Sequence, residues 1–184
     1  VVTDPRTHVA PTYTALADCL ARVDAHAWDA QSLCDKWLVR HVIAHLTMPV
    51  RMTPEKFGAE MAAAKGDFGV LSDTVALRDG DLPTEVLLEQ LRSPKLHEWE
   101  TPGGGWTGSM THAVVHSTDV TIPLQVAAAP TVDARLATLD ALVNNDQPLF
   151  GGTLDGVRLE ADDCDWSWGD GKVVRGDSAS LVAL

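Results

Sequence analysis

The chain has 184 residues, of which 45% are hydrophobic and 22% are charged, and its formal net charge at pH 7 is −12. This length suffices for one domain, or one domain with a small appendage, around a proper core. The acidic balance, with no block of Lys and Arg, argues against nucleic-acid and anionic-membrane partners. No apolar run approaches the ~20 residues of a membrane span, and the first residues have no signal-peptide core. We therefore expect a soluble, cytoplasmic protein, either a monomer or a homodimer.

The three cysteines, Cys19, Cys34 and Cys164, are odd in number and far apart, and none belongs to a C-x-x-C pair. This pattern fits a reducing compartment without a disulfide framework. We interpret each cysteine as a small buried hydrophobe. Cys34 has the chemistry of a soft metal ligand, but it lies in a connector, so the predicted site does not include it.

Apolar residues recur at steps of three and four along much of the chain, which predicts amphipathic helices. The predicted helices cover residues 11–26, a stretch from about residue 38 that Pro49 and Pro54 limit or bend, and residues 54–65, 83–97, 107–124 and 132–144. Residues 28–37 form a connector, and residues 101–108 form a glycine-rich loop. The stretch 68–79 is helix-like or irregular and stays unassigned.

After residue 150 the hydrophobic period changes from helical to alternating. Residues 157–163 alternate, and residues 165–176 suggest two short strands around a Gly-Asp-Gly turn, with Trp166 and Trp168 packing against the helices. The sequence therefore predicts a mainly α protein, with a four-helix bundle at residues 1–150 and a small α/β appendage at residues 151–184.

The helix at residues 107–124 carries two histidines, His112 and His116, four residues apart. On a helix this spacing places both imidazoles on one face, and Asp119 follows on that face three residues later. Two imidazoles and a carboxylate make half of a divalent-metal site, in which the acid either ligates or orients a ring. Without a third ligand, two histidines satisfied by backbone or water would be the better interpretation.

A third ligand is available upstream, where His41 and His45 are also four residues apart. His45 is flanked by apolar residues, whereas His41 follows Arg40 near the start of the predicted helix, so we select His45. Three imidazoles leave coordination positions open, which is the catalytic arrangement. Zinc is the expected metal, although imidazole also suits iron, nickel and copper. The remaining histidines have no partner at ligand spacing and are expected at the surface.

Three blocks of the sequence point to a known family: SLCDKWLVRHVIAHL at residues 32–46, HAVVHSTDVTIPL at residues 112–124, and DWSWGDGKVVRGDSASLVAL at residues 165–184. Together they resemble the mycothiol-dependent maleylpyruvate isomerase family of the DinB-like superfamily. The resemblance implies a DinB-like four-helix bundle with a small C-terminal α/β domain. It also implies a divalent metal, usually zinc, held by His45, His112 and His116, with Asp119 as the acid of the H-x-x-D motif.

This sequence departs from the family at two positions, because members often have an acidic residue where His112 stands and Asp where His41 stands. An all-histidine site would leave the metal more positively charged. Arg175 is a candidate anion contact in the small domain, and a surface arginine on a strand is an equally good interpretation. The chain ends at Leu184 as the expected last helix begins, which suggests a C-terminal domain cut short.

The leading hypothesis is a divalent-metal-dependent enzyme that activates a low-molecular-weight thiol such as mycothiol. The bound thiolate would catalyse the isomerisation of a small electrophilic substrate, or it would be transferred to that substrate. One alternative is a metal-dependent hydrolase on the same three histidines. The other is a non-catalytic bundle that binds an apolar ligand in its cavity.

Overall fold

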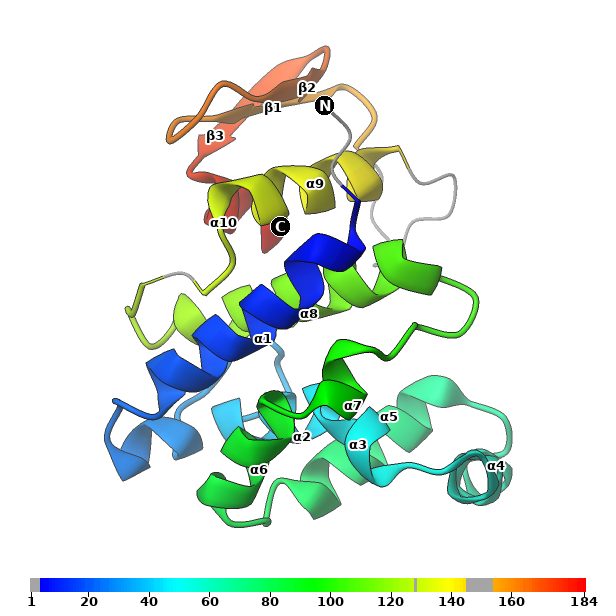
Figure 1. Cartoon of the computed structure of the whole chain (residues 1–184). Helices are drawn as coiled ribbons and strands as arrows, with labels where there is room; N and C mark the ends of the chain where they lie inside the picture. The colour runs from blue at the N-terminus through cyan, green and yellow to red at the C-terminus, as the bar shows by residue number, and fades with distance from the viewer. Residues whose placement is uncertain (1–3, 128, 145–153) are drawn as a thin grey trace.

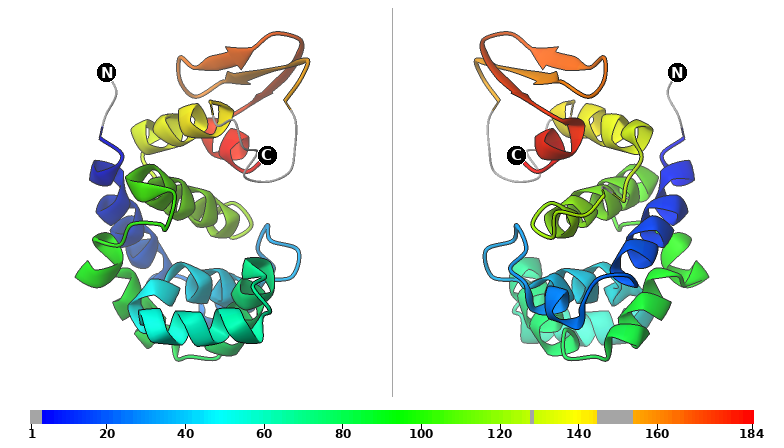
Figure 2. Two further views of the ribbon diagram at one scale, coloured as in Figure 1. Left: turned by 90° about the vertical axis from the view of Figure 1, so that its right-hand side faces the viewer. Right: turned by 90° about the vertical axis from the view of Figure 1, so that its left-hand side faces the viewer.

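The computed structural model describes residues 4–127, 129–144 and 154–184. It is mainly helical, and a small three-stranded sheet lies at the C-terminal end. Helix α8 runs through the middle of the molecule, with α2 to α7 on one side of it and α9 and the sheet on the other (Figures 1 and 2). The prediction of a mainly α protein with a small C-terminal α/β appendage is confirmed.

The N-terminal helices are α1 (Arg6–Leu20), the short 3₁₀ helix η1 (Ala25–Asp29), α2 (Val39–Leu46), α3 (Met48–Arg51), α4 (Pro54–Ala63), α5 (Phe68–Asp79), α6 (Thr84–Leu91) and α7 (Pro94–His97). The stretch that the sequence left unassigned is therefore the complete helix α5. Pro49 and Pro94 stand in the first turns of α3 and α7, where the missing N–H would have no helical partner. Each proline thus divides a predicted helix in two.

Helices α8 (Gly105–Thr121) and α9 (Val132–Val143) complete the helical part. Helix α8 begins two residues before the predicted start, so residues 105–108 are helical and do not belong to the predicted loop. It packs against α1, α2 and α9, while α2 also packs against α5. Because its neighbours surround it, α8 is buried on most of its circumference from Ser109 to Thr121. Its polar residues therefore lie in the interior.

The C-terminal sheet has the strand order β2-β1-β3, formed by β1 (Val157–Ala161), β2 (Ser167–Gly169) and β3 (Lys172–Gly176). Strand β1 is antiparallel to β2 and parallel to β3. The predicted Gly-Asp-Gly turn therefore joins the two outer strands across β1. Gly171 has a φ of +145°, and a Cβ there would lie 2.1 Å from the carbonyl oxygen of Gly156, so only glycine fits this crossing.

The appendage is attached to α9 by polar side chains. The Trp166 indole N–H donates to Asp140 at 2.8 Å, and Trp166 also packs against the main core, as predicted. Arg135 of α9 donates to Asp163 at 3.3 Å and to Ser178 at 2.8 Å, at the start of α10 (Ser178–Val182). The predicted domain boundary at residue 150 falls in residues 145–153, outside the described part of the chain.

Within the described ranges, none of the helices combines the length and the apolar character that a membrane-spanning segment needs.

Candidate metal centre

Helix α8 presents His112, His116 and Asp119 along one face, as their spacing predicts. Asp119 is 8% exposed, and both histidine rings are half-buried. The Asp119 carboxylate accepts a hydrogen bond from the Nδ1 of His116 at 2.7 Å. The interior position of α8 therefore places two imidazoles and a hydrogen-bonded carboxylate inside the helical part.

Helix α2 supplies the third imidazole, His45, which is 6% exposed. The other histidine of this helix, His41, has a different task. Its Nδ1 accepts the backbone N–H of Leu38 at 3.1 Å, which caps the start of α2, and its ring lies directly against Gly80. His41 is thus a capping residue, and the structure brings His45 rather than His41 to His112 and His116.

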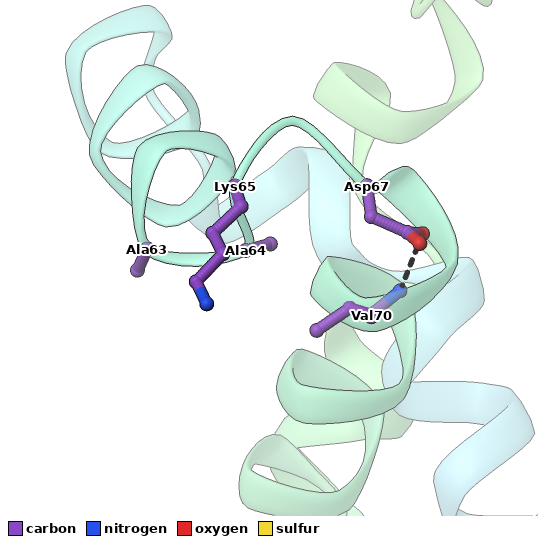
Figure 3. Close-up of a pocket in the computed structure, with 5 residues that line it drawn as sticks. All are labelled: Ala63, Ala64, Lys65, Asp67 and Val70. Carbon is purple, nitrogen blue, oxygen red and sulfur yellow. Dashed lines mark hydrogen bonds between the residues drawn. The ribbon is translucent and has the colours of Figure 1, made fainter.

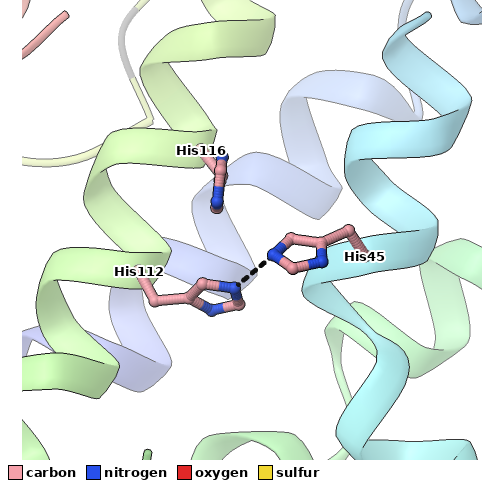
Figure 4. A group of neighbouring side chains, drawn as sticks. All are labelled: His45, His112 and His116. Carbon is pink, nitrogen blue, oxygen red and sulfur yellow. Dashed lines mark hydrogen bonds between the residues drawn. The ribbon is translucent and has the colours of Figure 1, made fainter. Parts of the chain in front are cut away.

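The three predicted ligands meet across the gap between α2 and α8 (Figure 4). The Nε2 atoms of His45 and His112 are 2.9 Å apart, and one nitrogen of each of the three rings lies within 4.8 Å of the others. The ring centroid of His116 lies 4.9 Å from that of His45 and 5.0 Å from that of His112. Three imidazole nitrogens therefore converge on one point, which is the donor set of a divalent transition metal.

The rings of His45 and His116 are each oriented by a hydrogen bond to the Nδ1 atom. The Ser72 hydroxyl, on α5, lies 3.0 Å from the Nδ1 of His45, and Asp119 holds the Nδ1 of His116. In each case the remote nitrogen is engaged and Nε2 is left for a ligand, as in metal sites with oriented imidazoles. The Nδ1 of His112 is buried and has no hydrogen-bond partner within the described residues.

Two tryptophans form walls beside the rings. The Trp37 ring centroid lies 4.9 Å from that of His45 and 6.3 Å from that of His116, and its indole N–H donates to Asp73 at 3.1 Å. The Trp99 ring lies edge-on to His112 with centroids 5.9 Å apart. These apolar faces limit the water around the cluster and strengthen electrostatic interactions within it.

The surroundings keep two of the rings, those of His45 and His112, uncharged. Burial lowers the pKa of His45 well below its usual 6.5, and the neighbouring His112 and His116 lower it further. Burial, and then His116, lower the pKa of His112 to about 3. Neutral imidazoles have a free lone pair, which a metal ion requires. The donor set, the convergence and the charge state therefore all fit a divalent cation.

The structure adds Cys34 to this neighbourhood, which the sequence analysis had excluded. Its thiol donates to Oδ2 of Asp119 at 3.3 Å, and it is half-buried. Burial, followed by the charge of Asp119, raises the pKa of this thiol to about 12. Cys34 does pack against the main core as a partly buried residue, but the prediction missed its contact with Asp119, which arises because the connector folds back onto α8.

Arg175, the other predicted catalytic residue, is not brought to the histidine cluster. It lies exposed on β3 and pairs with Glu160 of β1. The sheet stands at the opposite end of the molecule from α2 (Figures 1 and 2). Its proposed role as an anion contact stays a prediction.

A surface hollow of about 460 Å³ lies away from the histidines, where α4 turns into α5. Its lining includes Lys65, Asp67 and Val70 (Figure 3). Asp67 accepts the backbone N–H of Val70 at 3.1 Å, so its carboxylate caps α5. The hollow contains none of the residues of the histidine cluster.

Sequence reasoning missed Ser72, Cys34, Trp37 and Trp99 as neighbours of the site. Ser72 lies in the segment whose periodicity was too weak to assign. Trp37 lies in the predicted connector, and its contact with His45 depends on how that connector folds. The SLCDKW block, with a thiol and an indole beside a histidine helix, was the available signal.

Residues 9–96 match the family model of the Mycothiol maleylpyruvate isomerase N-terminal domain. No curated protein and no solved structure shows a significant match. The matched segment contains α2 with His45 and ends before α8. The convergence of His112 and His116 on His45 is therefore an observation independent of the family match.

Proposed function

Because the chain belongs to the mycothiol maleylpyruvate isomerase family through residues 9–96, we propose that it is a divalent-metal-dependent enzyme that uses a low-molecular-weight thiol. The observation that carries this proposal is the convergence of His45, His112 and His116, whose donor nitrogens lie within 4.8 Å of one another. A family of thiol-using enzymes and a three-imidazole donor set support the same chemistry from separate sources.

The three histidines would hold the metal, and Ser72 and Asp119 would keep two of the rings aligned. When bound, a divalent cation lowers the pKa of a coordinated thiol, so that the thiolate exists near neutral pH. Three protein ligands leave a coordination position free for such a thiol. We propose zinc, because it is the usual metal of sites with three imidazoles and an open position.

The surrounding residues would serve the reaction by their shape and polarity. Trp37 and Trp99 give the cluster apolar walls, which favour a small substrate with a flat, conjugated part. We propose mycothiol or a similar thiol as the cosubstrate. A family of this kind, and three free cysteines in the described chain, are consistent with a reducing cytoplasm.

The reaction that we propose begins when the thiolate sulfur adds to an activated carbon–carbon double bond. The π electrons move onto the electron-withdrawing group, which leaves a single bond about which the substrate rotates. In an isomerisation the carbon–sulfur bond then breaks, the double bond reforms and the thiolate is released. In a transfer reaction the carbon takes up a proton and the sulfur stays attached.

The test begins with protein that has been stripped by a chelator and carries no affinity-tag nickel. The wild type, a His45→Ala/His116→Ala double variant and a His26→Ala control are each loaded with Zn²⁺ and analysed for bound metal. His26 suits the control because it is exposed and outside the cluster. Each protein is then assayed with mycothiol and a panel of α,β-unsaturated acids, with and without the thiol.

We expect about one equivalent of zinc in the wild type and in His26→Ala, with none in the double variant, and turnover only when thiol is present. Turnover without thiol would refute the thiol-dependent proposal, and cleavage products formed from water would replace it with a metal-dependent hydrolase. A wild-type protein that cannot be loaded with any divalent metal would refute the enzymatic proposal and leave the ligand-binding bundle.

A further inference from the structure

The turn formed by residues 31–37, here called the Cys34 turn, makes two hydrogen bonds to one residue of helix α8, Asp119. The backbone N–H of Leu33 donates to the Asp119 carbonyl at 3.0 Å, and the thiol of Cys34 donates to Oδ2 of the Asp119 carboxylate at 3.3 Å. Two neighbouring residues thus hold both the main chain and the side chain of Asp119.

The Cys34 turn is itself rigidly bonded. The Ser32 hydroxyl donates to the Trp37 carbonyl at 2.6 Å and accepts the backbone N–H of Cys34 at 3.1 Å. The Gln31 amide donates to the carbonyls of Cys34 at 2.9 Å and Trp37 at 3.0 Å. These bonds fix the position of Cys34 independently of α8. The thiol therefore reaches Asp119 from a turn that has hydrogen bonds of its own and belongs to a different element from α8.

The same carboxylate oxygen, Oδ2 of Asp119, accepts hydrogen bonds from Cys34 and from the Nδ1 of His116, at 2.7 Å. A carboxylate with one partner can rotate about its last side-chain bond, because that torsion is broad. A second donor from another element restricts this rotation. It also keeps Oδ2 directed at the His116 ring.

We propose that Cys34 is a positioning residue for His116, acting through Asp119. Its thiol holds the carboxylate, the carboxylate holds the Nδ1–H of His116, and the Nε2 of His116 is left facing His45 and His112. The effect on metal binding rests on the proposed function. The orientation of the ring is a property of the metal-free protein and can be measured without any metal.

Cys34→Ala removes the donor, and Cys34→Ser keeps a hydroxyl donor at nearly the same place. Cys164→Ala is a matched control, because that thiol also donates to a carboxylate, Asp163, at 3.5 Å but lies in the appendage. The first readout is ¹⁵N NMR of the His116 ring in the metal-free protein, which distinguishes the tautomer with a proton on Nδ1 from the one with a proton on Nε2. The second is Zn²⁺ affinity by competition with a chelating dye.

We expect the Nδ1–H tautomer of His116 in the wild type, Cys34→Ser and Cys164→Ala, and a mixture of tautomers in Cys34→Ala. Loss of the outer partner of a metal-binding histidine weakens affinity by about 10- to 100-fold. Cys34→Ala acts one bond further away, so we expect a loss of about 3- to 10-fold, with Cys34→Ser and Cys164→Ala unchanged.

An unchanged tautomer in Cys34→Ala would overturn the proposal. A thiolate-to-metal charge-transfer band in the Co²⁺ protein that Cys34→Ser abolishes would overturn it as well, because Cys34 would then be a ligand together with His116 and Asp119. If the wild type binds no metal but the tautomers behave as expected, the proposed function fails and the positioning role of Cys34 stands.

Discussion

Two polar clusters lie inside the same set of helices, and they differ in how their hydrogen-bonding groups are used. The first, at Arg51, is closed. The Arg51 guanidinium donates to Asp79 at 2.9 Å, to Thr47 at 2.8 Å, to the Ala44 carbonyl at 2.7 Å and to Gln90. All of its nitrogens have partners, so the Arg51 cluster ties α3 to α2, α5 and α6 and offers nothing to a ligand.

The histidine cluster is open by comparison. The Nε2 atoms of His45 and His112 are 2.9 Å apart, and one nitrogen of each of the three rings lies within 4.8 Å of the others. The remote nitrogen of His112 has no partner in the described chain. Such an arrangement contributes little to folding, because buried polar groups stabilise only when they are satisfied. The comparison teaches that a buried polar cluster indicates function when its ligand atoms converge on one point instead of pairing within the protein.

The largest effect should follow from removing a ligand. Apparent zinc affinities of four-ligand sites correspond to about 10–16 kcal/mol, so one ligand is worth about 3–4 kcal/mol. We therefore expect His116→Ala to weaken Zn²⁺ binding by about 10²- to 10³-fold, measured by competition with a chelating dye. The metal-free variant should unfold in urea within about 1 kcal/mol of the wild type. If His116→Ala greatly destabilised the metal-free protein, the histidine cluster would stabilise the fold as the Arg51 cluster does, and the comparison between them would fail.

Arg51→Met should have the opposite effects: it should lower the stability of the metal-free protein and leave metal affinity unchanged. It leaves the carboxylate of Asp79, whose side chain is 13% exposed, without a main partner, and breaking a buried pair costs about 3 kcal/mol or more. Urea unfolding of the metal-free protein measures this loss, and metal affinity should not change. The matched control is Arg92→Met, which breaks the exposed Arg92–Asp18 pair and should cost less than about 1 kcal/mol.

Equal destabilisation by Arg51→Met and Arg92→Met would show that the Arg51 cluster is no more stabilising than a surface ion pair.

Ser72→Ala should have an intermediate effect on both metal affinity and the free energy of unfolding. It frees the Nδ1 of His45, and loss of such an outer partner lowers metal affinity by about 10-fold or more. An unsatisfied buried nitrogen also costs about 1–2 kcal/mol in the metal-free protein. Thr74→Ala, at an exposed position of the same helix, should change neither quantity, so a similar result for both variants would refute the role of Ser72.

The sequence could predict the part of the site that depends on local geometry. His112, His116 and Asp119 share a helix, so their spacing alone places them on one face. His45 could be chosen because its neighbours are apolar, which predicts that its ring lies inside. Nothing local indicates that Ser72 reaches His45, because this contact depends on how α5 packs against α2.

The fold was predictable to a similar degree. The late helices and the Gly-Asp-Gly turn follow from period and residue type, and the appendage follows from a change of period at residue 150. Helix α5 was missed because its apolar residues are spread around the helix, so no amphipathic stripe identifies it. Cys34 was missed because a connector has no periodicity from which its path can be read.

The smallest expected effect is the part of the pH dependence of stability that Asp79 of the Arg51 cluster contributes. Burial acts to raise the pKa of Asp79, but its hydrogen bonds to Arg78 and Arg51 outweigh burial, and the pKa lies below its usual value of 3.8. A carboxyl with a lowered pKa in the folded protein stabilises it fully above the unfolded pKa of about 3.9, and this contribution is lost as the pH falls through the folded value.

Urea unfolding of the metal-free wild type and of Asp79→Asn at pH 7, 5, 4 and 3 would measure that contribution. We expect the wild type to be more stable by a constant amount between pH 7 and 5, and the difference to shrink below pH 4, because protonated Asp79 no longer pairs with the guanidinium groups. A difference that stays constant down to pH 3 would mean that Asp79 stabilises the fold through hydrogen bonds that survive protonation, and that its charge contributes nothing.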